Sequence, residues 1–183
     1  TRRSSDLPCP KDLENIPRPR LGFFGLIRDW VDVGLLAEVA KKRKDWHFVL
    51  IGDADSSVDL SRYRSQTNLH FLGRRPYETL PAYCRHFDVG LIPFKVNELT
   101  HAVNPIKLRE YLAAGLPVVS TPMPEVALYK DWIEIADSPL EVEAAVERLL
   151  KRPHQREERM NAMASECWPS KINRILDGLK TAE

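Results

Sequence analysis

The chain lacks three features that would each define a class of protein. Its three cysteines, Cys9, Cys84 and Cys167, are odd in number and widely separated, so the sequence predicts neither a disulfide framework nor a zinc site and fits a reducing cytosol. No apolar run reaches the roughly eighteen residues that a membrane-spanning helix needs. The formal net charge is only +1, which argues against nucleic acid or a charged membrane surface as the main partner.

Several catalytic and nucleotide-binding patterns are missing as well. There is no Gly-x-Gly-x-x-Gly fingerprint and no Walker sequence, so neither a dinucleotide site nor an ATP site of those types is predicted. No Ser/His/Asp or Cys/His arrangement is recognisable, and the carboxylates show no catalytic spacing. The sequence therefore predicts no bound cofactor and no metal centre, and it names no catalytic residue.

The length and composition are those of a globular domain. The 183 residues, of which 43% are hydrophobic, are enough to bury a core. Residues 1–20 carry four of the fourteen prolines and show no periodicity, which predicts a linker or loop. The polar start of the chain is interpreted as a cut from a longer protein. We expect regular structure to begin at Leu21 and one domain to occupy residues 21–183.

Apolar segments alternate with helical patterns along this domain. The predicted strands cover 21–25, 46–52, 68–73, 88–94, 117–121 and 132–136. Helical patterns lie near 31–44, 80–87, 104–114, 138–152, 153–166 and 169–180, with Asp32 capping the first and a Ser138–Glu141 capping box opening the fourth. This alternation predicts an α/β fold, a doubly wound parallel sheet with strand order 3-2-1-4-5-6. A ligand is then expected at the carboxyl ends of the strands.

The most informative stretch is 104–121, which reads NPIKLREYLAAGLPVVST. Asn104 is predicted to cap a helix that has Pro105 at its first position. Gly115 is expected to end that helix in the left-handed conformation. Within the helix, Lys107 and Glu110 are three residues apart and therefore share a face.

A cation and a carboxylate at the start of a helix that feeds a parallel sheet indicate a site for phosphate and hydroxyl groups. Lys107 can meet a diphosphate, and the carboxylate of Glu110 can accept both hydroxyls of a ribose. The competing interpretation is an exposed ion pair within the helix, which contributes only tenths of a kcal/mol. The capped helix and the strand behind it favour the binding site.

Other candidates follow the predicted strand ends. Gly25 allows close approach to a phosphate, although a glycine also lets a strand end tightly. Arg28 is as consistent with a solvated side chain as with a diphosphate contact. Gly73 and Arg74 follow the third strand, where Arg74 can stack on a base, contact a phosphate, or form part of a surface basic pair. His101, in the predicted loop before Asn104, can donate to a phosphate or sugar or lie exposed.

These residues belong to a longer pattern that resembles one protein family. The segments GFFGLIRDWVDVGLLAEVAKKRKDWHFVLIGDA, NLHFLGRRPYETLPAYCRHFDVGLIPF, NPIKLREYLAAGLPVVST and CWPSKINRIL resemble, in order and spacing, the carboxyl-terminal half of GT-B-type glycosyltransferases of group 1, the family 4-like set. The resemblance runs from about Pro19 to Leu179. It implies one lobe of a two-lobed fold, which binds a UDP- or GDP-sugar donor, while the missing amino-terminal lobe carries the acceptor site and the catalytic groups.

The resemblance also implies roles for particular residues. Glu110 matches the second glutamate of the family's E-x7-E motif, which holds the ribose hydroxyls, whereas Ala102 stands where the first glutamate would contact the donor sugar. Gly25 matches the glycine of the first phosphate loop, and the arginine and lysine that the family often has after it are absent, so Lys107 and Arg28 would neutralise the diphosphate. The implied activity is retaining sugar transfer in polysaccharide or cell-surface glycan synthesis. The implied location is the cytoplasm. An alternative that the resemblance also allows is peripheral association of the full protein with the cytoplasmic face of a membrane.

Two other functions remain open at this point. The first is a non-enzymatic α/β ligand-binding module such as a receiver-like domain, although Gly25 and Gly73 stand where a receiver needs acidic residues. The second is a fragment of a sugar-nucleotide epimerase, which shares the two-lobed fold.

Overall fold

A computed structural model describes residues 7–152, 155–164, 166, 170 and 172 of the chain. Its central feature is a six-stranded sheet with strand order β3-β2-β1-β4-β5-β6, in which all neighbouring strands pair in parallel. The strands are β1 (Arg20–Phe24), β2 (His47–Ile51), β3 (Leu69–Gly73), β4 (Val89–Ile92), β5 (Val118–Ser120) and β6 (Ile133–Ile135). The doubly wound fold and the strand order predicted from the sequence are confirmed.

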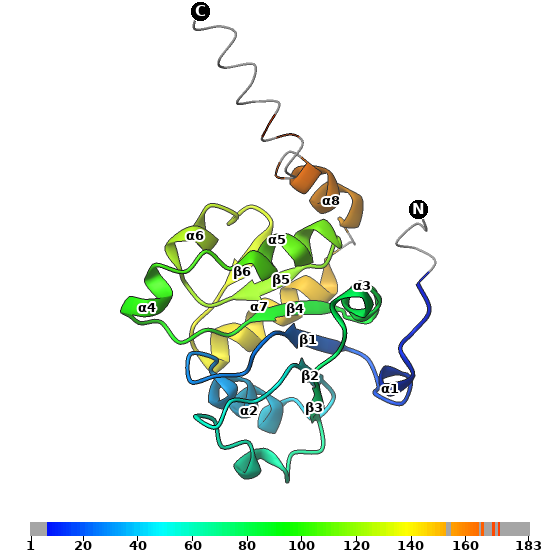
Figure 1. The fold of residues 1–183 in the computed structure, drawn as a ribbon, viewed down its shortest axis with the longest axis vertical. Helices are drawn as coiled ribbons and strands as arrows, with labels where there is room; N and C mark the ends of the chain where they lie inside the picture. Colours follow the sequence, from blue (N-terminus) through cyan, green and yellow to red (C-terminus); the bar gives the residue numbers. More distant parts are fainter. Residues whose placement is uncertain (1–6, 153–154, 165, 167–169, 171, 173–183) are drawn as a thin grey trace, which may run out of the picture.

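Helices cover both faces of the sheet (Figure 1). On one face lie α2 (Val33–Lys42) and α7 (Pro139–Lys151), which contact each other as well as the sheet. On the other lie α3 (Leu80–His86) and α5 (Ile106–Ala113), and α8 (Arg156–Ala164) packs against α5. The four inner strands, β2, β1, β4 and β5, are almost continuously buried, as expected for a parallel sheet covered on both sides, whereas the outer strands β3 and β6 are only partly buried.

The helix starts agree with the sequence in one case and differ in detail in another. Asp32 caps α2 as predicted, because its side chain accepts a hydrogen bond from the N–H of Leu35 at 2.8 Å. Ser138 likewise accepts from the N–H of Glu141. The carboxylate of Glu141, however, accepts from the N–H of Asp137 rather than completing a capping box with Ser138.

The segment before β1 is more ordered than the sequence predicted. A helical turn, α1 (Lys11–Glu14), precedes β1, so regular structure does not begin at Leu21. Leu13 of this turn is fully buried, and Asp12 forms an ion pair with Arg75 at 2.7 Å. An apolar side chain and an ion pair therefore fasten the segment to the domain, although its prolines suggested a loop.

Other short elements were not predicted. They are α4 (Glu98–His101), α6 (Pro124–Ala127) and two turns of 3-10 helix, Ser61–Tyr63 and Tyr77–Thr79. The helix predicted at 169–180 lies largely outside the described residues.

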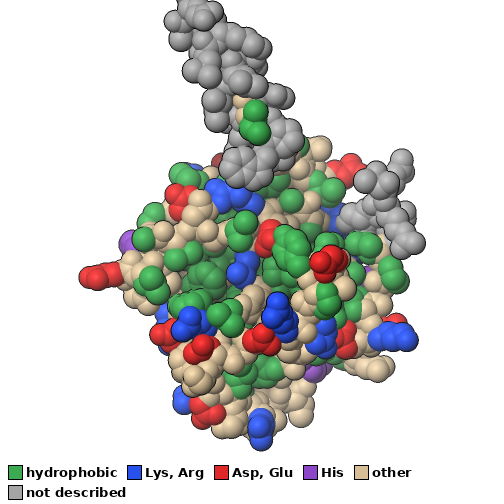
Figure 2. All heavy atoms as spheres, viewed as in Figure 1, with side chains coloured by type: hydrophobic (Ala, Val, Ile, Leu, Met, Phe, Trp, Pro, Cys, Tyr) green, Lys and Arg blue, Asp and Glu red, His purple; other side chains and the backbone are tan. Residues whose placement is uncertain are grey.

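No helix in the described part of the chain is both long and apolar enough to cross a bilayer. On the face drawn in Figure 2, basic and acidic side chains are interspersed among hydrophobic ones.

Candidate functional site

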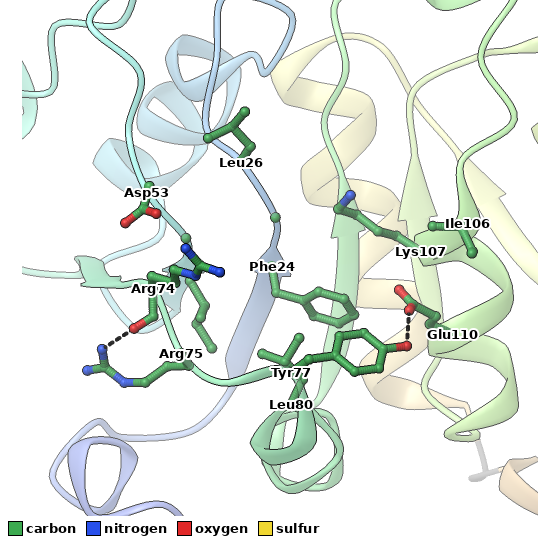
Figure 3. Close-up of a pocket in the computed structure, with 13 residues that line it drawn as sticks. Phe24, Leu26, Asp53, Arg74, Arg75, Tyr77, Leu80, Ile106, Lys107 and Glu110 are labelled. Carbon is green, nitrogen blue, oxygen red and sulfur yellow. Dashed lines mark hydrogen bonds between the residues drawn. The ribbon is translucent and has the colours of Figure 1, made fainter.

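A cavity of about 440 Å³ opens at the carboxyl edge of the sheet, between the ends of β1, β2 and β3 and the start of α5. Figure 3 shows its wall, which is formed by Phe24, Gly25, Leu26, Ile51, Gly52, Asp53, Arg74, Arg75, Tyr77, Leu80, Ile106, Lys107 and Glu110. This is the edge at which the sequence predicted a ligand.

The floor of the cavity is bare backbone, because adjacent strands end in glycines that touch. The N–H of Gly25 donates to the carbonyl of Ile51 at 2.8 Å, and the N–H of Gly52 donates to the carbonyl of Gly73 at 3.0 Å. Gly25 and Gly52 have φ values of 140° and 150°, which L side chains rarely adopt. A Cβ atom on Gly52 would overlap the carbonyl group of Gly25. Only glycine lets these two strand ends approach so closely.

The opposite wall is the first turn and a half of α5. Leu108, Tyr111 and Leu112 bury one side of this helix against the sheet, which leaves Lys107 and Glu110 facing the cavity (Figure 3). Gly115 ends the helix with φ 72°, as predicted. Its N–H donates to Leu112 and the next N–H donates to Tyr111, which together form a Schellman motif.

The beginning of α5 differs from the prediction at Asn104. Pro105 is the N-cap, and no side chain caps this end. The side-chain oxygen of Asn104 instead accepts a hydrogen bond from the guanidinium of Arg109. The first N–H groups of α5 are therefore not occupied by a capping side chain, which suits an end of the helix that faces a ligand.

Lys107 lies directly over the Gly25 loop. A Cβ atom on Gly25 would be only 2.8 Å from the Lys107 ammonium nitrogen, so the absence of a side chain makes room for the lysine. Burial lowers the pKa of Lys107, and the nearby Glu110 carboxylate partly opposes this shift. A partly desolvated ammonium beside exposed backbone and a helix N-terminus is a suitable environment for an anion.

Glu110 accepts a hydrogen bond from the hydroxyl of Tyr77 at 2.8 Å, drawn as a dashed line in Figure 3. This hydrogen bond is the main reason that the pKa of Tyr77 is raised. Tyr77 opens the short 3-10 helix after β3, 33 residues from Glu110. Sequence reasoning did not identify Tyr77, because no local pattern links two residues so far apart.

The third side of the cavity comes from the ends of β2 and β3. Asp53 and Arg74 stand there, across Phe24 from Lys107 in Figure 3. The side chain of Arg75 is held at the rim by Asp12 and by the hydroxyl of Tyr83. Gly52 and Asp53 were not named among the predicted site residues, although a ligand was expected at the carboxyl ends of the strands and the repeated glycine there is a signal that could have identified them.

The structure brings together only part of the predicted set. Gly25, Arg74, Lys107 and Glu110 line the cavity, and Gly73 lies directly before Arg74. Three other predicted residues are not among the lining residues: Arg28, His101 and Asn104.

Each of these three side chains has a structural reason to be elsewhere. Arg28 forms an ion pair with Asp55 at 3.5 Å and lies over the ring of Trp30. His101 is exposed at the end of α4 rather than in a loop, and Asn104 is engaged by Arg109. His101, which the sequence offered as a donor to a phosphate or sugar, therefore does not line the cavity that Lys107 and Glu110 face.

Comparison with known proteins is consistent across sequence and fold. A family described as "Glycosyl transferases group 1" matches residues 18–152. A putative teichuronic acid biosynthesis glycosyltransferase of Bacillus subtilis (strain 168), TuaH, is 30% identical over 166 residues. That match covers 85% of this chain but only 42% of the relative, so the chain spans less than half of the length of the curated protein.

Solved structures share the fold at low sequence identity. Anabaena Alr3699/HepE, solved in complex with UDP and glucose, superposes with a TM-score of 0.70 at 14% identity, over 90% of this chain and 48% of that one. The C-terminal domain of a group 1 family glycosyl transferase from Francisella tularensis, LpcC, gives a TM-score of 0.60 at 17% identity, over 89% of this chain and 93% of that one.

Proposed function

Because the chain belongs to the group 1 glycosyltransferases, we propose that the cavity at the end of β1 binds the nucleoside diphosphate of a sugar donor, UDP or GDP. The observation that carries the proposal is the arrangement of Lys107, Gly25 and Glu110 around one cavity. It offers an ammonium and a carboxylate from one turn of α5, with the bare backbone of Gly25 beside the ammonium. A nucleoside diphosphate needs the same set of partners, because it joins anionic phosphates to a neutral diol.

The diphosphate is assigned to the side of Lys107. There the ammonium, the Gly25 loop and the uncapped N-terminus of α5 all favour negative charge. A bound phosphate would also replace the water that burial has removed from the lysine, which is the condition under which a charge-assisted hydrogen bond is strong.

The ribose is assigned to Glu110, whose carboxylate can accept from both vicinal hydroxyls. Arg74, across the cavity, is placed beside the base, where a guanidinium can stack on a ring or meet a phosphate. These assignments agree with the roles that the family resemblance implied for Gly25 and Glu110. Ala102 has no carboxylate to offer a donor sugar, so we expect sugar recognition to rest on other groups.

For the whole protein we propose retaining sugar transfer in the synthesis of a cell-surface polysaccharide. The relative from B. subtilis, whose name refers to teichuronic acid, supports a cell-surface product, and the Anabaena structure with UDP supports a nucleotide-linked donor. We further propose that a second lobe of the same chain supplies the acceptor site and the catalytic groups. The described lobe by itself should bind nucleotide and transfer little or no sugar.

Nucleotide binding can be tested by thermal unfolding. A ligand at ten times its Kd adds about 1.4 kcal/mol to the free energy of unfolding, which for a domain of this size is a rise in Tm of about 3–6 °C. We expect that rise with UDP or GDP and none with NAD. A Tm that no nucleotide changes would contradict the proposal.

The ribose assignment is tested by Glu110→Gln, with Glu38→Gln on the exposed side of α2 as the matched control. Loss of a charged acceptor costs about 1.5–3 kcal/mol of binding. Titration calorimetry should therefore show much weaker nucleotide binding in Glu110→Gln and unchanged binding in Glu38→Gln. Equal affinity in the two variants would refute the role of Glu110 even if the chain binds nucleotide.

The epimerase alternative makes a different prediction for the full protein. An epimerase converts the sugar-nucleotide without an acceptor, whereas a transferase releases UDP or GDP only as it glycosylates an acceptor. Product analysis of the full protein with donor alone, and then with cell-envelope acceptors, distinguishes the two.

A further inference from the structure

Tyr77 stands between two cavities and touches both. One is the donor cavity described above. The other, of about 330 Å³, lies on the α3 side and is lined by Phe24, Tyr77, Leu80, Pro81, Cys84, Glu110, Ala113 and Ala114. The two cavities share Phe24, Tyr77, Leu80 and Glu110. The hydrogen bond from Tyr77 to Glu110 therefore spans the boundary between them.

The side chain of Tyr77 is large but only lightly held. Tyr77 is 69% exposed, which is unusual for an aromatic residue at the wall of a cavity. Its hydroxyl donates to Oε1 of Glu110 at 2.8 Å. An exposed ring fixed by one polar contact can leave at little cost in buried surface. The second cavity, with the apolar side chains of Leu80 and Pro81 in its wall, offers room for the displaced ring.

Tyr77 donates its hydrogen bond to the Glu110 carboxylate, which is the group assigned above to the ribose of the donor. In the absence of ligand, the phenol supplies a hydroxyl to the same carboxylate that would accept the hydroxyls of a ribose. A vicinal diol binds a carboxylate best through both oxygens at once. The Tyr77 hydroxyl and the ribose therefore compete for Oε1 of Glu110 and for the space beside it.

We propose that Tyr77 is an affinity-determining residue of the donor site, whose hydroxyl occupies the ribose-binding carboxylate of Glu110 until a donor displaces it. This inference rests on the proposed role of Glu110. Displacement lowers the affinity for any nucleotide that uses Glu110, because part of the binding free energy is spent on breaking the O–H···O bond. A nucleotide that lacks both ribose hydroxyls leaves the Tyr77–Glu110 bond intact and does not incur this cost.

The test is the variant Tyr77→Phe, which keeps the ring and removes the hydroxyl. By calorimetry, we expect it to bind UDP about threefold to tenfold more tightly than the wild type, as removal of one competing hydrogen bond from a largely exposed side chain predicts. Its affinity for 2′,3′-dideoxyuridine diphosphate should stay within about twofold of the wild-type value. If GDP rather than UDP binds the wild type, the guanosine pair of nucleotides replaces the uridine pair.

Tyr129→Phe serves as the matched control, since Tyr129 lies under the guanidinium of Arg109 and not at either cavity. It should leave both affinities unchanged. Equal or weaker UDP binding by Tyr77→Phe would overturn the proposal, because the hydroxyl would then help the donor or be irrelevant to it. Equal tightening for UDP and the dideoxy nucleotide would also overturn it, since the gain would not come through the ribose hydroxyls.

The experiment separates this inference from the function on which it rests. If Glu110→Gln weakens UDP binding and Tyr77→Phe fails to strengthen it, the donor site stands and the competition is refuted. If Glu110→Gln leaves UDP binding unchanged, the ribose assignment is refuted, and the role of Tyr77 is refuted with it.

Discussion

Charged side chains at the two ends of the strands differ in how many partners they have. The amino ends of the strands form one edge of the sheet, the amino edge, and their carboxyl ends form the other, the carboxyl edge. At the amino edge, where α2 ends and β2 begins, Arg43 is surrounded by partners. It pairs with Asp45 at 2.9 Å and with Glu147 at 2.6 Å, and its guanidinium lies 3.8 Å from the centre of the Trp46 ring. These hydrogen bonds raise its pKa. Arg43 joins α2 to α7. Because its guanidinium is already bonded to these carboxylates, few of its N–H groups are available to bind a ligand.

At the carboxyl edge, Lys107 has no comparable partners. In the part of the chain that the structure describes, it forms no ion pair, and burial lowers its pKa. Its neighbours are the backbone of Gly25 and, more distantly, Glu110. The difference indicates which charges serve the fold and which are available to a ligand, because a partly buried cation without a close partner is unfavourable unless another role retains it.

The largest expected effect comes from the backbone of the carboxyl edge. Gly52→Ala would place a Cβ atom against the Gly25 carbonyl at a φ of 150°, so clash and strain act together. We expect a loss of about 3 kcal/mol or more in the free energy of unfolding, measured by urea denaturation. Gly73→Ala is the control, since its φ of 69° is unfavourable but its Cβ atom would come no closer than 3.9 Å to a neighbouring atom, in the Arg75 side chain. It should lose only about 1–2 kcal/mol, and equal losses would show that contact between the strand ends matters little.

The two cations should respond oppositely to the same substitution. Arg43→Met removes the ion pairs and the ring contact and should cost about 1–2 kcal/mol of stability without changing nucleotide affinity. Lys107→Met should keep its stability within about 0.5 kcal/mol and weaken UDP binding about tenfold or more. Urea denaturation and calorimetry on both variants check this. If Lys107→Met loses as much free energy of unfolding as Arg43→Met, then Lys107 also serves the fold, and the contrast between the two edges is refuted.

The carboxylates offer a milder version of the same test. Asp88, directly before β4, accepts from the guanidinium of Arg18 and from the backbone N–H of Arg20. Asp88→Asn should therefore lower stability by about 1 kcal/mol and leave UDP affinity unchanged. Glu110→Gln should instead leave stability unchanged and weaken UDP binding. A loss of nucleotide binding in Asp88→Asn would mean that the amino edge also shapes the donor site.

The smallest effect concerns pH. His47 and His70 lie on neighbouring strands with ring nitrogens 3.0 Å apart, and burial lowers the pKa of both, helped by Arg20 beside His47 and by His47 beside His70. The unfolded chain takes up these protons near pH 6.5 while the folded chain resists them. Stability should therefore be full above pH 6.5 and fall as the pH drops below it.

Urea midpoints between pH 7.5 and 5, measured for the wild type and for His70→Gln, check this expectation. The fall should be shallower in His70→Gln, and the exposed His101→Gln variant should follow the wild type. Identical curves for all three proteins would show that the histidine pair does not control the acid response.

The sequence was sufficient for the sheet because most of the strands are short apolar runs, which identify buried parallel strands. Periodicity could not set the exact ends, so the predicted strand 88–94 exceeds the observed Val89–Ile92. Asp32 was predicted correctly because capping is local. Asn104 was not, because Arg109, five residues away, competes for its side chain.

The site was predictable only as far as local chemistry reaches. Lys107 and Glu110 share a helix face by spacing alone, and Gly25 follows from the end of a strand. His101 does not lie in a loop because Asn97 and Thr100 form a capping box that starts the short helix α4. The role of Tyr77 depends on a contact between the 3-10 helix after β3 and the distant helix α5, and no pattern within either segment encodes it.

The contact between α8 and the Schellman motif at Gly115 has a consequence for folding during synthesis of the chain. The side chain of Arg159 in α8 donates to the carbonyl of Gly115 at 3.1 Å, and Arg156 packs where a Cβ atom would stand. The helix that bears Lys107 and Glu110 thus receives its last support from residues more than forty positions further along the chain. During translation the strands and the nucleotide-facing groups emerge first. A ribosome that stalls before Arg156 would present the donor cavity with α5 packed on the sheet but without the support that α8 gives to its carboxyl end.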